Sequence, residues 1–263
     1  MTLTSYGRIG LGTAQLAFKD VSVAQAVATI HAALDCGIDV VDTALAYTRP
    51  GVESFAEAVV AKALNGRADV LVATKGGHRR AGDGFPIDGR PAALRADCAV
   101  SLRTLGVDTI GLYQLHHVDP DVPLVESVGA LEELRTEGKI RMIGLSNVDT
   151  AQIERASTVA PIVSVQNRLS IGERADGPTV EYCARHGIAY LAYMPLHGVG
   201  EAGAVQAVAD RHGVSPQRVC LAWVLAQAPN VMALVGASRP VTIEDSAAAA
   251  GLLLDDEDLR RLD

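Results

Sequence analysis

Short apolar runs alternate with longer amphipathic segments along this chain. Eight runs rich in aliphatic and β-branched residues are recognisable, at 9–11, 39–43, 70–74, 110–115, 140–145, 162–166, 188–192 and 231–235. Each is followed by a segment with helical spacing, and continuous apolar strands alternating with helices are typical of parallel sheets covered by helices. Eight such units predict an α/β protein with a closed (β/α)8 barrel, the TIM barrel.

Helix-end signals agree with this pattern. Pro123 suits a first helical turn and Gly138 suits a helix end. The apolar residues between them share one helical face: Leu124, Val128, Leu131 and Leu134. Gly37 and Gly187 precede the second and seventh strands, where glycine can adopt the left-handed conformation that ends a helix. An open doubly wound sheet is the alternative, but Gly7, Gly10 and Gly12 lack the spacing of a dinucleotide-binding loop.

Length and composition fit one large core. The chain has 263 residues, close to the roughly 250 of a typical barrel, so we expect a single domain over residues 1–263. A net charge of -8 disfavours binding to nucleic acid or to anionic membranes. No signal segment and no long apolar span is visible, which predicts a cytoplasmic protein.

The four cysteines form no C-x-x-C pair and fall in expected helices: Cys36, Cys98, Cys183 and Cys220. We therefore expect buried, reduced thiols without a disulfide or metal role. A metal is not expected elsewhere either, because no histidine or carboxylate cluster has ligand spacing beyond Asp42 and His116.

Four chemically versatile residues lie at the ends of successive expected strands. Asp42 ends the second, Tyr47 follows five residues later, Lys75 follows the third and His116 ends the fourth. The C-terminal ends of barrel strands share one rim, so these side chains should converge. Alone, each residue is better explained by a structural role: a helix cap for Asp42, a packing residue for Tyr47, a solvated charge for Lys75 and a hydrogen-bonded core histidine for His116. Their joint placement favours a catalytic site.

The motifs around these residues resemble the aldo-keto reductase family over nearly the whole chain. They are Asp-Thr-Ala-Leu-Ala-Tyr at 42–47, Ala-Thr-Lys at 73–75, Leu-Tyr-Gln-Leu-His at 112–116 and Gly-Leu-Ser-Asn at 144–147. The resemblance implies NADP(H)-dependent reduction of a small aldehyde or ketone, with Asp42, Tyr47, Lys75 and His116 as the catalytic tetrad.

The chemistry explains these residue types. Hydride attack on a carbonyl carbon leaves an alkoxide that needs a proton, and tyrosine, with a pKa of about 10, is a reluctant donor. A lysine ammonium about 4 Å away would stabilise tyrosinate by on the order of 4 kcal/mol before desolvation is counted. Asp42 would keep Lys75 charged, and His116 would hydrogen-bond the carbonyl oxygen.

The resemblance also implies a cofactor-binding set. Ser146, Asn147 and Gln166 would surround the nicotinamide carboxamide, and Tyr193 would stack on its ring, beside Pro195 and Leu196. After the eighth strand, Gly236, Ser238 and Arg239 open a helix whose free N–H groups suit a phosphate. Ser238 and Arg239 are the candidates for the 2′-phosphate, although Arg239 could instead be a solvated cap residue, and Asp245 is the candidate for the adenine end.

Two long loops, 76–90 and 196–204, are expected to cover the site. The first carries His78, Arg79, Arg80, Asp83, Phe85 and Asp88, which would favour a polar or anionic carbonyl compound unless the loop is merely solvated. Only three Phe and one Trp are present, with Trp223 expected in helix packing, so a strongly aromatic pocket is not expected. Two other functions remain open: a Schiff-base aldolase using Lys75, which Asp42 disfavours, and a non-catalytic barrel that senses a nicotinamide cofactor.

Overall fold

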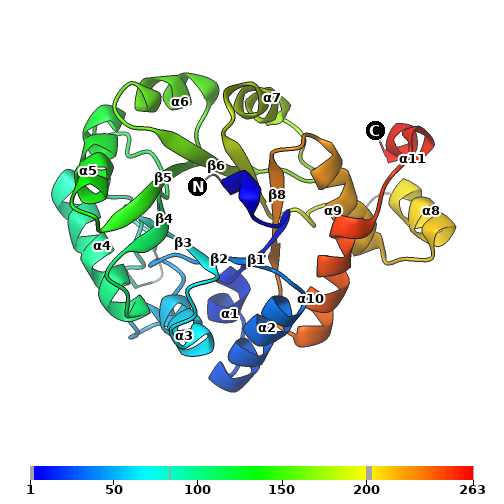
Figure 1. Cartoon of the computed structure of the whole chain (residues 1–263), viewed down its shortest axis with the longest axis horizontal. Coiled ribbons are helices and arrows are strands. Elements are labelled where there is room, and N and C mark those ends of the chain that lie inside the picture. Colours follow the sequence, from blue (N-terminus) through cyan, green and yellow to red (C-terminus); the bar gives the residue numbers. More distant parts are fainter. Residues whose placement is uncertain (1–2, 83, 200–202, 263) are drawn as a thin grey trace.

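Eight parallel strands form a closed barrel in chain order in the computed structural model, which describes residues 3–82, 84–199 and 203–262 (Figure 1). Each strand pairs with the next, and β8 pairs with β1. The strands are β1 (Ile9–Gly12), β2 (Val40–Asp42), β3 (Leu71–Gly76), β4 (Ile110–Leu115), β5 (Ile140–Ser146), β6 (Ile162–Arg168), β7 (Ala189–Tyr193) and β8 (Val231–Gly236). The predicted TIM barrel is confirmed.

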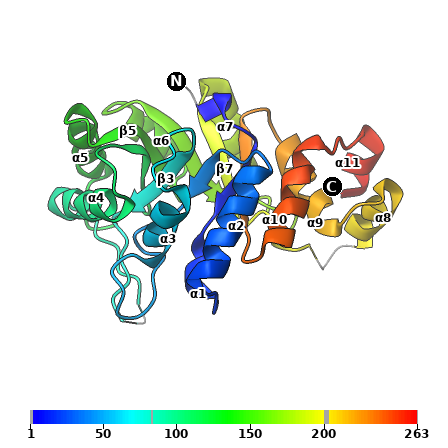
Figure 2. The same ribbon diagram turned by 60° about the horizontal axis from the view of Figure 1, so that its bottom comes forward.

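One helix per strand forms the outer ring. These helices are α2 (Val23–Asp35), α3 (Phe55–Leu64), α4 (Pro91–Leu105), α5 (Leu124–Thr136), α6 (Thr150–Ser157), α7 (Gly177–His186), α9 (Pro216–Ala226) and α10 (Pro240–Ala247). Further helices are added to this plan: η1 (Leu3–Ser5), α1 (Ala14–Phe18), α8 (Gly203–His212), η2 (Ala248–Gly251) and α11 (Asp256–Leu262). Helices α8 and α11 lie side by side outside the ring (Figures 1 and 2).

Alternate residues of each strand face opposite sides of the sheet, which divides the apolar core in two. Outward-facing residues such as Leu11, Val41 and Ile143 pack against the helix ring. Inward-facing residues fill the end of the barrel at which the strands begin, together with Leu3 of η1: Val40, Leu71, Ala73, Leu112, Met142, Ala189, Leu191, Met232 and Leu234.

The barrel interior changes from apolar to polar along its axis. In β3, the inward positions run from Leu71 and Ala73 to Lys75, and in β4 they run from Leu112 to Gln114. Because the polar positions lie toward the C-terminal ends of the strands, they gather at one end of the barrel. Figure 2 shows α1 at that end, opposite the N-terminus.

The expected helix ends are present. Gly37, Gly138 and Gly187 have φ angles of 82°, 74° and 67°, which L side chains rarely adopt. Pro123 precedes α5 as its N-cap, one position earlier than expected. The expectation of four buried thiols is wrong for Cys36, which follows the last residue of α2 and is exposed, whereas the other three cysteines are buried.

The loop after β3 folds back on itself through bridges between His78 and Ile87 and between Ala81 and Gly84. Its first turn needs a glycine, since Gly77 has a φ of 80°. The loop after β7 is shorter than expected because α8 begins at Gly203, and residues 200–202, like Asp83, lie outside the described residues. Among the described helices, none combines the length and apolar character that crossing a bilayer demands.

Candidate active site

A buried ion pair lies at the polar end of the barrel. Lys75 Nζ is 2.8 and 2.7 Å from the two carboxylate oxygens of Asp42 and also donates to the carbonyl oxygen of Thr43 at 2.8 Å. The Lys75 side chain is fully buried. Burial alone would lower the pKa of Lys75, but Asp42 and Tyr47 outweigh it and the pKa is raised. Lys75 is therefore an ammonium at neutral pH, which disfavours the Schiff-base alternative.

Tyr47 lies directly beside this pair. Its hydroxyl is 3.4 Å from Lys75 Nζ. Burial raises the pKa of the Tyr47 hydroxyl, while the Lys75 ammonium acts in the opposite direction. The pKa of Tyr47 is therefore raised overall, whereas attraction to Lys75 alone would lower it. Removal from water penalises the tyrosinate more than one paired lysine stabilises it. Tyr47 thus carries its proton at neutral pH.

His116 completes the group of four. Its ring meets the Tyr47 ring edge to face, with centroids 5.8 Å apart. Burial lowers the pKa of His116 well below the usual range, and the Lys75 charge acts in the same direction. A neutral imidazole has one N–H donor and one acceptor. The four residues selected from the strand ends are therefore brought together, with a cation, an acid and a neutral hydrogen-bonding ring side by side.

Two glutamine amides support the Asp42 carboxylate. Gln166 Nε2 donates to Oδ1 at 2.8 Å, and Gln114 Nε2 approaches the same oxygen at 3.4 Å. Gln114 was not singled out from the sequence, although its place between Leu112 and His116 gives it the inward orientation. Gly144 makes room for it, since a Cβ there would lie 3.0 Å from Gln114 Cγ and 2.2 Å from Ser164 Oγ.

The residues expected around a carboxamide also lie together. Asn147 Nδ2 donates to the carbonyl oxygen of His116 at 3.0 Å and to Ser146 Oγ at 3.1 Å, while its Oδ1 accepts from the Tyr193 hydroxyl at 2.7 Å. Ser146 Oγ donates to the carbonyl oxygen of Gln166 at 2.8 Å. Pro195 and Leu196 form the turn that follows Tyr193. A pocket of about 410 Å³ adjoins Asn147 and Tyr193.

The rim after β8 places the phosphate candidates at the start of α10. Gly236 ends β8, and the Ser238 carbonyl oxygen accepts from Gln25 Nε2 at 2.7 Å. Arg239 is the N-cap of α10; it is exposed and has no ion pair within the described part of the chain. Asp245 lies on α10 but is engaged by α9, since Arg218 Nη2 and Ser215 Oγ contact its carboxylate at 2.6 and 2.5 Å.

The loop charges expected to attract an anionic substrate are used within the protein. Arg79 pairs with the buried carboxylate of Asp97. Arg80 donates to the carbonyl oxygens of Gly82 and Thr48 and lies over the Phe85 ring. Asp88 pairs with Arg90.

Aromatic residues nevertheless gather beside Tyr47. Phe18 of α1 lies edge to face with both Tyr47 and Phe85, at centroid distances of 5.8 and 5.9 Å. Both phenylalanines are substantially exposed despite their size. Two of the three Phe residues in the chain thus gather at one place, which composition alone could not reveal. Trp223 is buried in α9, as expected.

The family model described as the Aldo/keto reductase family matches residues 8–263. The chain belongs to this family. An uncharacterised oxidoreductase of Schizosaccharomyces pombe is 34% identical over 90% of this chain and 78% of its own. Pyridoxine 4-dehydrogenase of Escherichia coli is 32% identical over 98% of this chain and 94% of its own.

Solved structures agree with the family assignment. Glycerol dehydrogenase from Gluconobacter oxydans has a TM-score of 0.86 at 30% identity, covering 98% of this chain and 90% of its own. An aldo/keto reductase from Klebsiella pneumoniae, in complex with NADP and acetate, has a TM-score of 0.84 at 30% identity, covering 97% and 89%. A Klebsiella structure with NADPH also matches, with a TM-score of 0.82.

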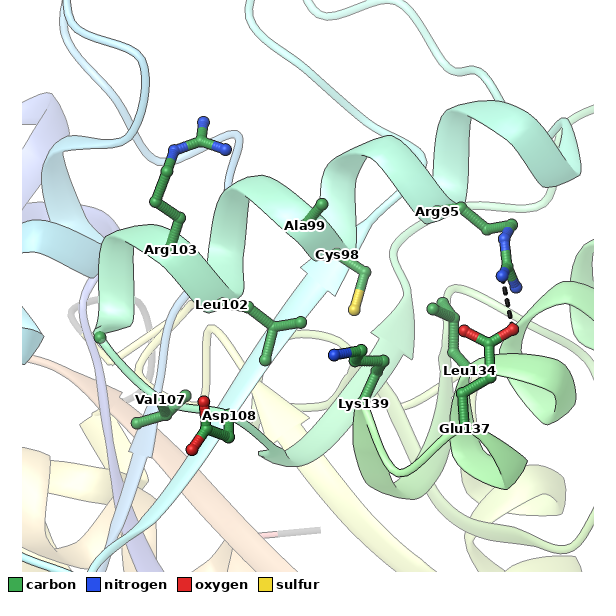
Figure 3. Close-up of a pocket in the computed structure, with 11 residues that line it drawn as sticks. Arg95, Cys98, Ala99, Leu102, Arg103, Val107, Asp108, Leu134, Glu137 and Lys139 are labelled. Carbon is green, nitrogen blue, oxygen red and sulfur yellow. Dashed lines mark hydrogen bonds and ion pairs between the residues drawn. The ribbon is translucent and has the colours of Figure 1, made fainter.

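This aldo/keto reductase also has a pocket of about 590 Å³ on the outside of the barrel, between α4 and the region after α5 (Figure 3). Arg95 and Glu137 form an ion pair across it, and Lys139 and Cys98 line its wall. Burial raises the pKa of the Cys98 thiol to about 12, so this cysteine is no nucleophile at neutral pH. The pocket shares no lining residue with the group of four.

Proposed function

We propose that this aldo/keto reductase reduces an aldehyde or ketone to an alcohol with NADPH, and that Tyr47 donates the proton. The observation that carries the proposal is the contact between the Tyr47 hydroxyl and Lys75 Nζ, backed by the Asp42 carboxylate in a buried setting. A protein that merely sensed the cofactor would have no need for a protonated acid beside a buried cation.

The residues present fit NADP(H). Ser146, Asn147 and Gln166 offer hydroxyl and amide groups for the carboxamide, and Tyr193 is held by its hydroxyl with its ring partly exposed. Among the described residues Arg239 makes no ion pair, and its position at a helix N-terminus suits the 2′-phosphate. The Klebsiella relatives are in complex with NADP and NADPH. Asp245, already paired with Arg218, stays a prediction for the adenine end.

Bound NADPH would supply a hydride to the carbonyl carbon. His116 would donate its N–H to the carbonyl oxygen, which fixes the oxygen near the Tyr47 hydroxyl. Tyr47 would then pass its proton to the developing alkoxide, and Lys75 would stabilise the tyrosinate that remains. Asp42 holds Lys75 in place, and the buried setting strengthens each of these charge interactions.

The walls of the site favour a neutral substrate with an aromatic or apolar body. Phe18 packs edge to face on Tyr47 and on Phe85, whereas Arg79 and Arg80 already have partners. Two relatives carry the names pyridoxine 4-dehydrogenase and glycerol dehydrogenase, so compact alcohols and their aldehydes are suitable probes. A cytoplasmic location remains part of this proposal.

The test compares the native chain with Tyr47→Phe in the oxidation of NADPH by 4-nitrobenzaldehyde, with NADH in parallel. We expect kcat to fall by about two orders of magnitude or more in the variant, because a general acid typically contributes that much. NADPH binding, followed by fluorescence titration, should be unchanged. Tight NADPH binding without turnover by the native chain would favour the cofactor-sensing alternative, and absence of binding would refute the proposal.

A further inference from the structure

Three histidines meet at the mouth of the candidate active site. His116 and His117 directly follow β4, and His78 comes from the loop after β3. Their ligand nitrogens all lie within 4.8 Å of one another. The His78 ring lies 4.8 Å from both the His116 and the His117 ring, measured between centroids. Sequence spacing does not reveal this group, because His78 is brought in only by the folded-back loop.

The available nitrogens point to ligation. His78 Nε2 lies 2.7 Å from the carbonyl oxygen of Phe85, so Nε2 carries the proton and Nδ1 carries a lone pair. Metal-binding histidines commonly have this arrangement, in which the second nitrogen donates to a backbone carbonyl. His78 Nδ1 is buried without a hydrogen-bond partner, and so is His116 Nδ1. Two buried ring nitrogens therefore lack any other use in the described structure.

We propose that His78, His116 and His117 bind one divalent cation of the zinc class, with a water molecule as fourth ligand, and that this cation inhibits the reductase. Three imidazoles with an open fourth position form a familiar tetrahedral zinc environment. Imidazole ligands also suit Co²⁺, Ni²⁺ and Cu²⁺, which makes Co²⁺ a usable spectroscopic substitute.

The charge state of the cluster is suitable. A histidine must be neutral to ligate a metal, and the pKa of each ring is lowered, mainly by burial, to about 4 for His117 and well below the usual range for His116. The nearby Lys75 cation would repel a metal, but Asp42 pairs with it through both carboxylate oxygens. Lys75 therefore faces the cluster as a paired and not as a free cation.

Binding requires a modest rearrangement. Zn–N bonds of about 2.0–2.1 Å place tetrahedral ligand atoms roughly 3.3 Å apart, so the nitrogens must close by about 1.5 Å from the widest separation. The His116 and His117 rings are nearly parallel, at 16°, and a metal lies in the plane of each ring that binds it. His117 must therefore rotate, which its half-buried position permits.

Inhibition follows from the identity of the ligands. A metal on His116 would reorient the ring that would hydrogen-bond the carbonyl oxygen, and this ring meets the Tyr47 ring edge to face. Zinc should therefore compete with the aldehyde and leave NADPH affinity unchanged. Only this kinetic consequence rests on the proposed function, because the binding itself requires no activity.

The experiment titrates the metal-free, cofactor-free protein with Co²⁺ and follows the visible absorption bands of a four-coordinate complex. Calorimetry with Zn²⁺ gives stoichiometry and affinity. We expect one site per chain, and His78→Ala or His117→Ala should weaken zinc by at least about 100-fold, since even changes in second-shell partners cost 10–100-fold. His186→Gln, at an exposed histidine of α7, is the matched control and should bind like the native chain.

Near-ultraviolet circular dichroism of each variant shows whether the fold is intact, so that loss of a metal-binding histidine can be distinguished from unfolding. The proposal is overturned if no four-coordinate spectrum appears, or if His78→Ala and His117→Ala bind zinc as tightly as the His186→Gln control. If the spectrum appears but native protein without metal fails to turn over any carbonyl, the metal site stands and the proposed function falls. If zinc binds without raising the apparent KM of an active enzyme, the inhibition is refuted.

Discussion

Replacement of Asp42 by Asn tests how much the Asp42 charge contributes to the free energy of unfolding by compensating the buried Lys75 ammonium. The substitution keeps the shape of the side chain and an oxygen that can accept from Gln166, but removes the charge opposite Lys75. Lys75 is fully buried, so its ammonium would remain uncompensated. Removal of one partner of a buried pair typically costs 3–5 kcal/mol, and we expect a loss in that range at pH 7.

The loss should shrink at higher pH. In the native protein the pKa of Lys75 is raised, so its stabilising contribution is complete below the ordinary lysine pKa of about 10.4 and is lost as pH rises through the raised value. In Asp42→Asn the pKa of Lys75 falls below 10.4, and folding then releases a proton. Stability of the variant should therefore increase between pH 7 and pH 9.5, whereas that of the native chain should not.

Urea unfolding followed by the fluorescence of the single Trp223, which is buried in α9, measures this difference. A matched double variant, Asp42→Asn with Lys75→Met, removes both charges and should recover all but about 1–2 kcal/mol, since apolar replacement of a buried pair is often near neutral. Both variants should be inactive. A loss below 1 kcal/mol in Asp42→Asn, or a double variant less stable than Asp42→Asn, would refute the reasoning.

Three further outcomes are expected. Arg239→Met should raise the Kd for NADPH about tenfold while that for NADH stays within twofold, because a charge-assisted hydrogen bond contributes about 1.5–3 kcal/mol; fluorescence titration of both cofactors measures this. Asp97→Asn should raise KM for the aldehyde about three- to tenfold in steady-state assays with little change in kcat. The reason is that the Asp97 carboxylate accepts a hydrogen bond from the Gly77 N–H at 2.8 Å and pairs with Arg79, and both contacts anchor the loop that carries His78. A thiol reagent at pH 8 should label Cys36 alone in the native protein and four thiols in guanidinium, since burial raises the pKa of the other three to about 11 or 12.

Each of these has a contradicting result. Equal losses of NADPH and NADH affinity in Arg239→Met would remove Arg239 from the 2′-phosphate. A fall in kcat equal to the rise in KM in Asp97→Asn would mean that Asp97 affects the reacting groups and not only the loop. Rapid labelling of a second thiol would show that a buried cysteine opens to solvent faster than the packing of α4, α7 and α9 suggests.

The strands were predictable because the buried runs are almost wholly apolar. Their C-terminal ends were not, since β5, β6 and β7 continue through Ser146, Arg168 and Tyr193, where polar and aromatic side chains interrupt the signal but backbone pairing persists. Helix ends followed from glycine, whose conformational freedom is a local property. The burial of Cys36 was predicted wrongly because a residue that caps a helix need not lie on the buried face of that helix.

The group of four was predictable because three members lie at or next to strand ends and Tyr47 lies in the loop after one of them, and barrel closure brings strand ends together. Gln114 escaped notice because its role depends on the Asp42 carboxylate across the barrel, which adjacent residues do not encode. The aromatic contacts of Phe18 and Phe85, and the approach of His78 to His116, depend on how two loops fold over the rim. Such loop contacts carry no periodic signal.

The hydrogen bonds of Asn147 bear on which parts of the cofactor would contribute most of its binding free energy. Its amide already satisfies both ends on the protein, donating to the His116 carbonyl oxygen and accepting from the Tyr193 hydroxyl. A carboxamide that binds there exchanges one hydrogen bond for another, so the net gain in free energy at this residue is small. If the nicotinamide carboxamide binds at Asn147 as proposed, tight binding would come mainly from ring stacking and from the phosphate end, while Asn147 would select one orientation of the amide.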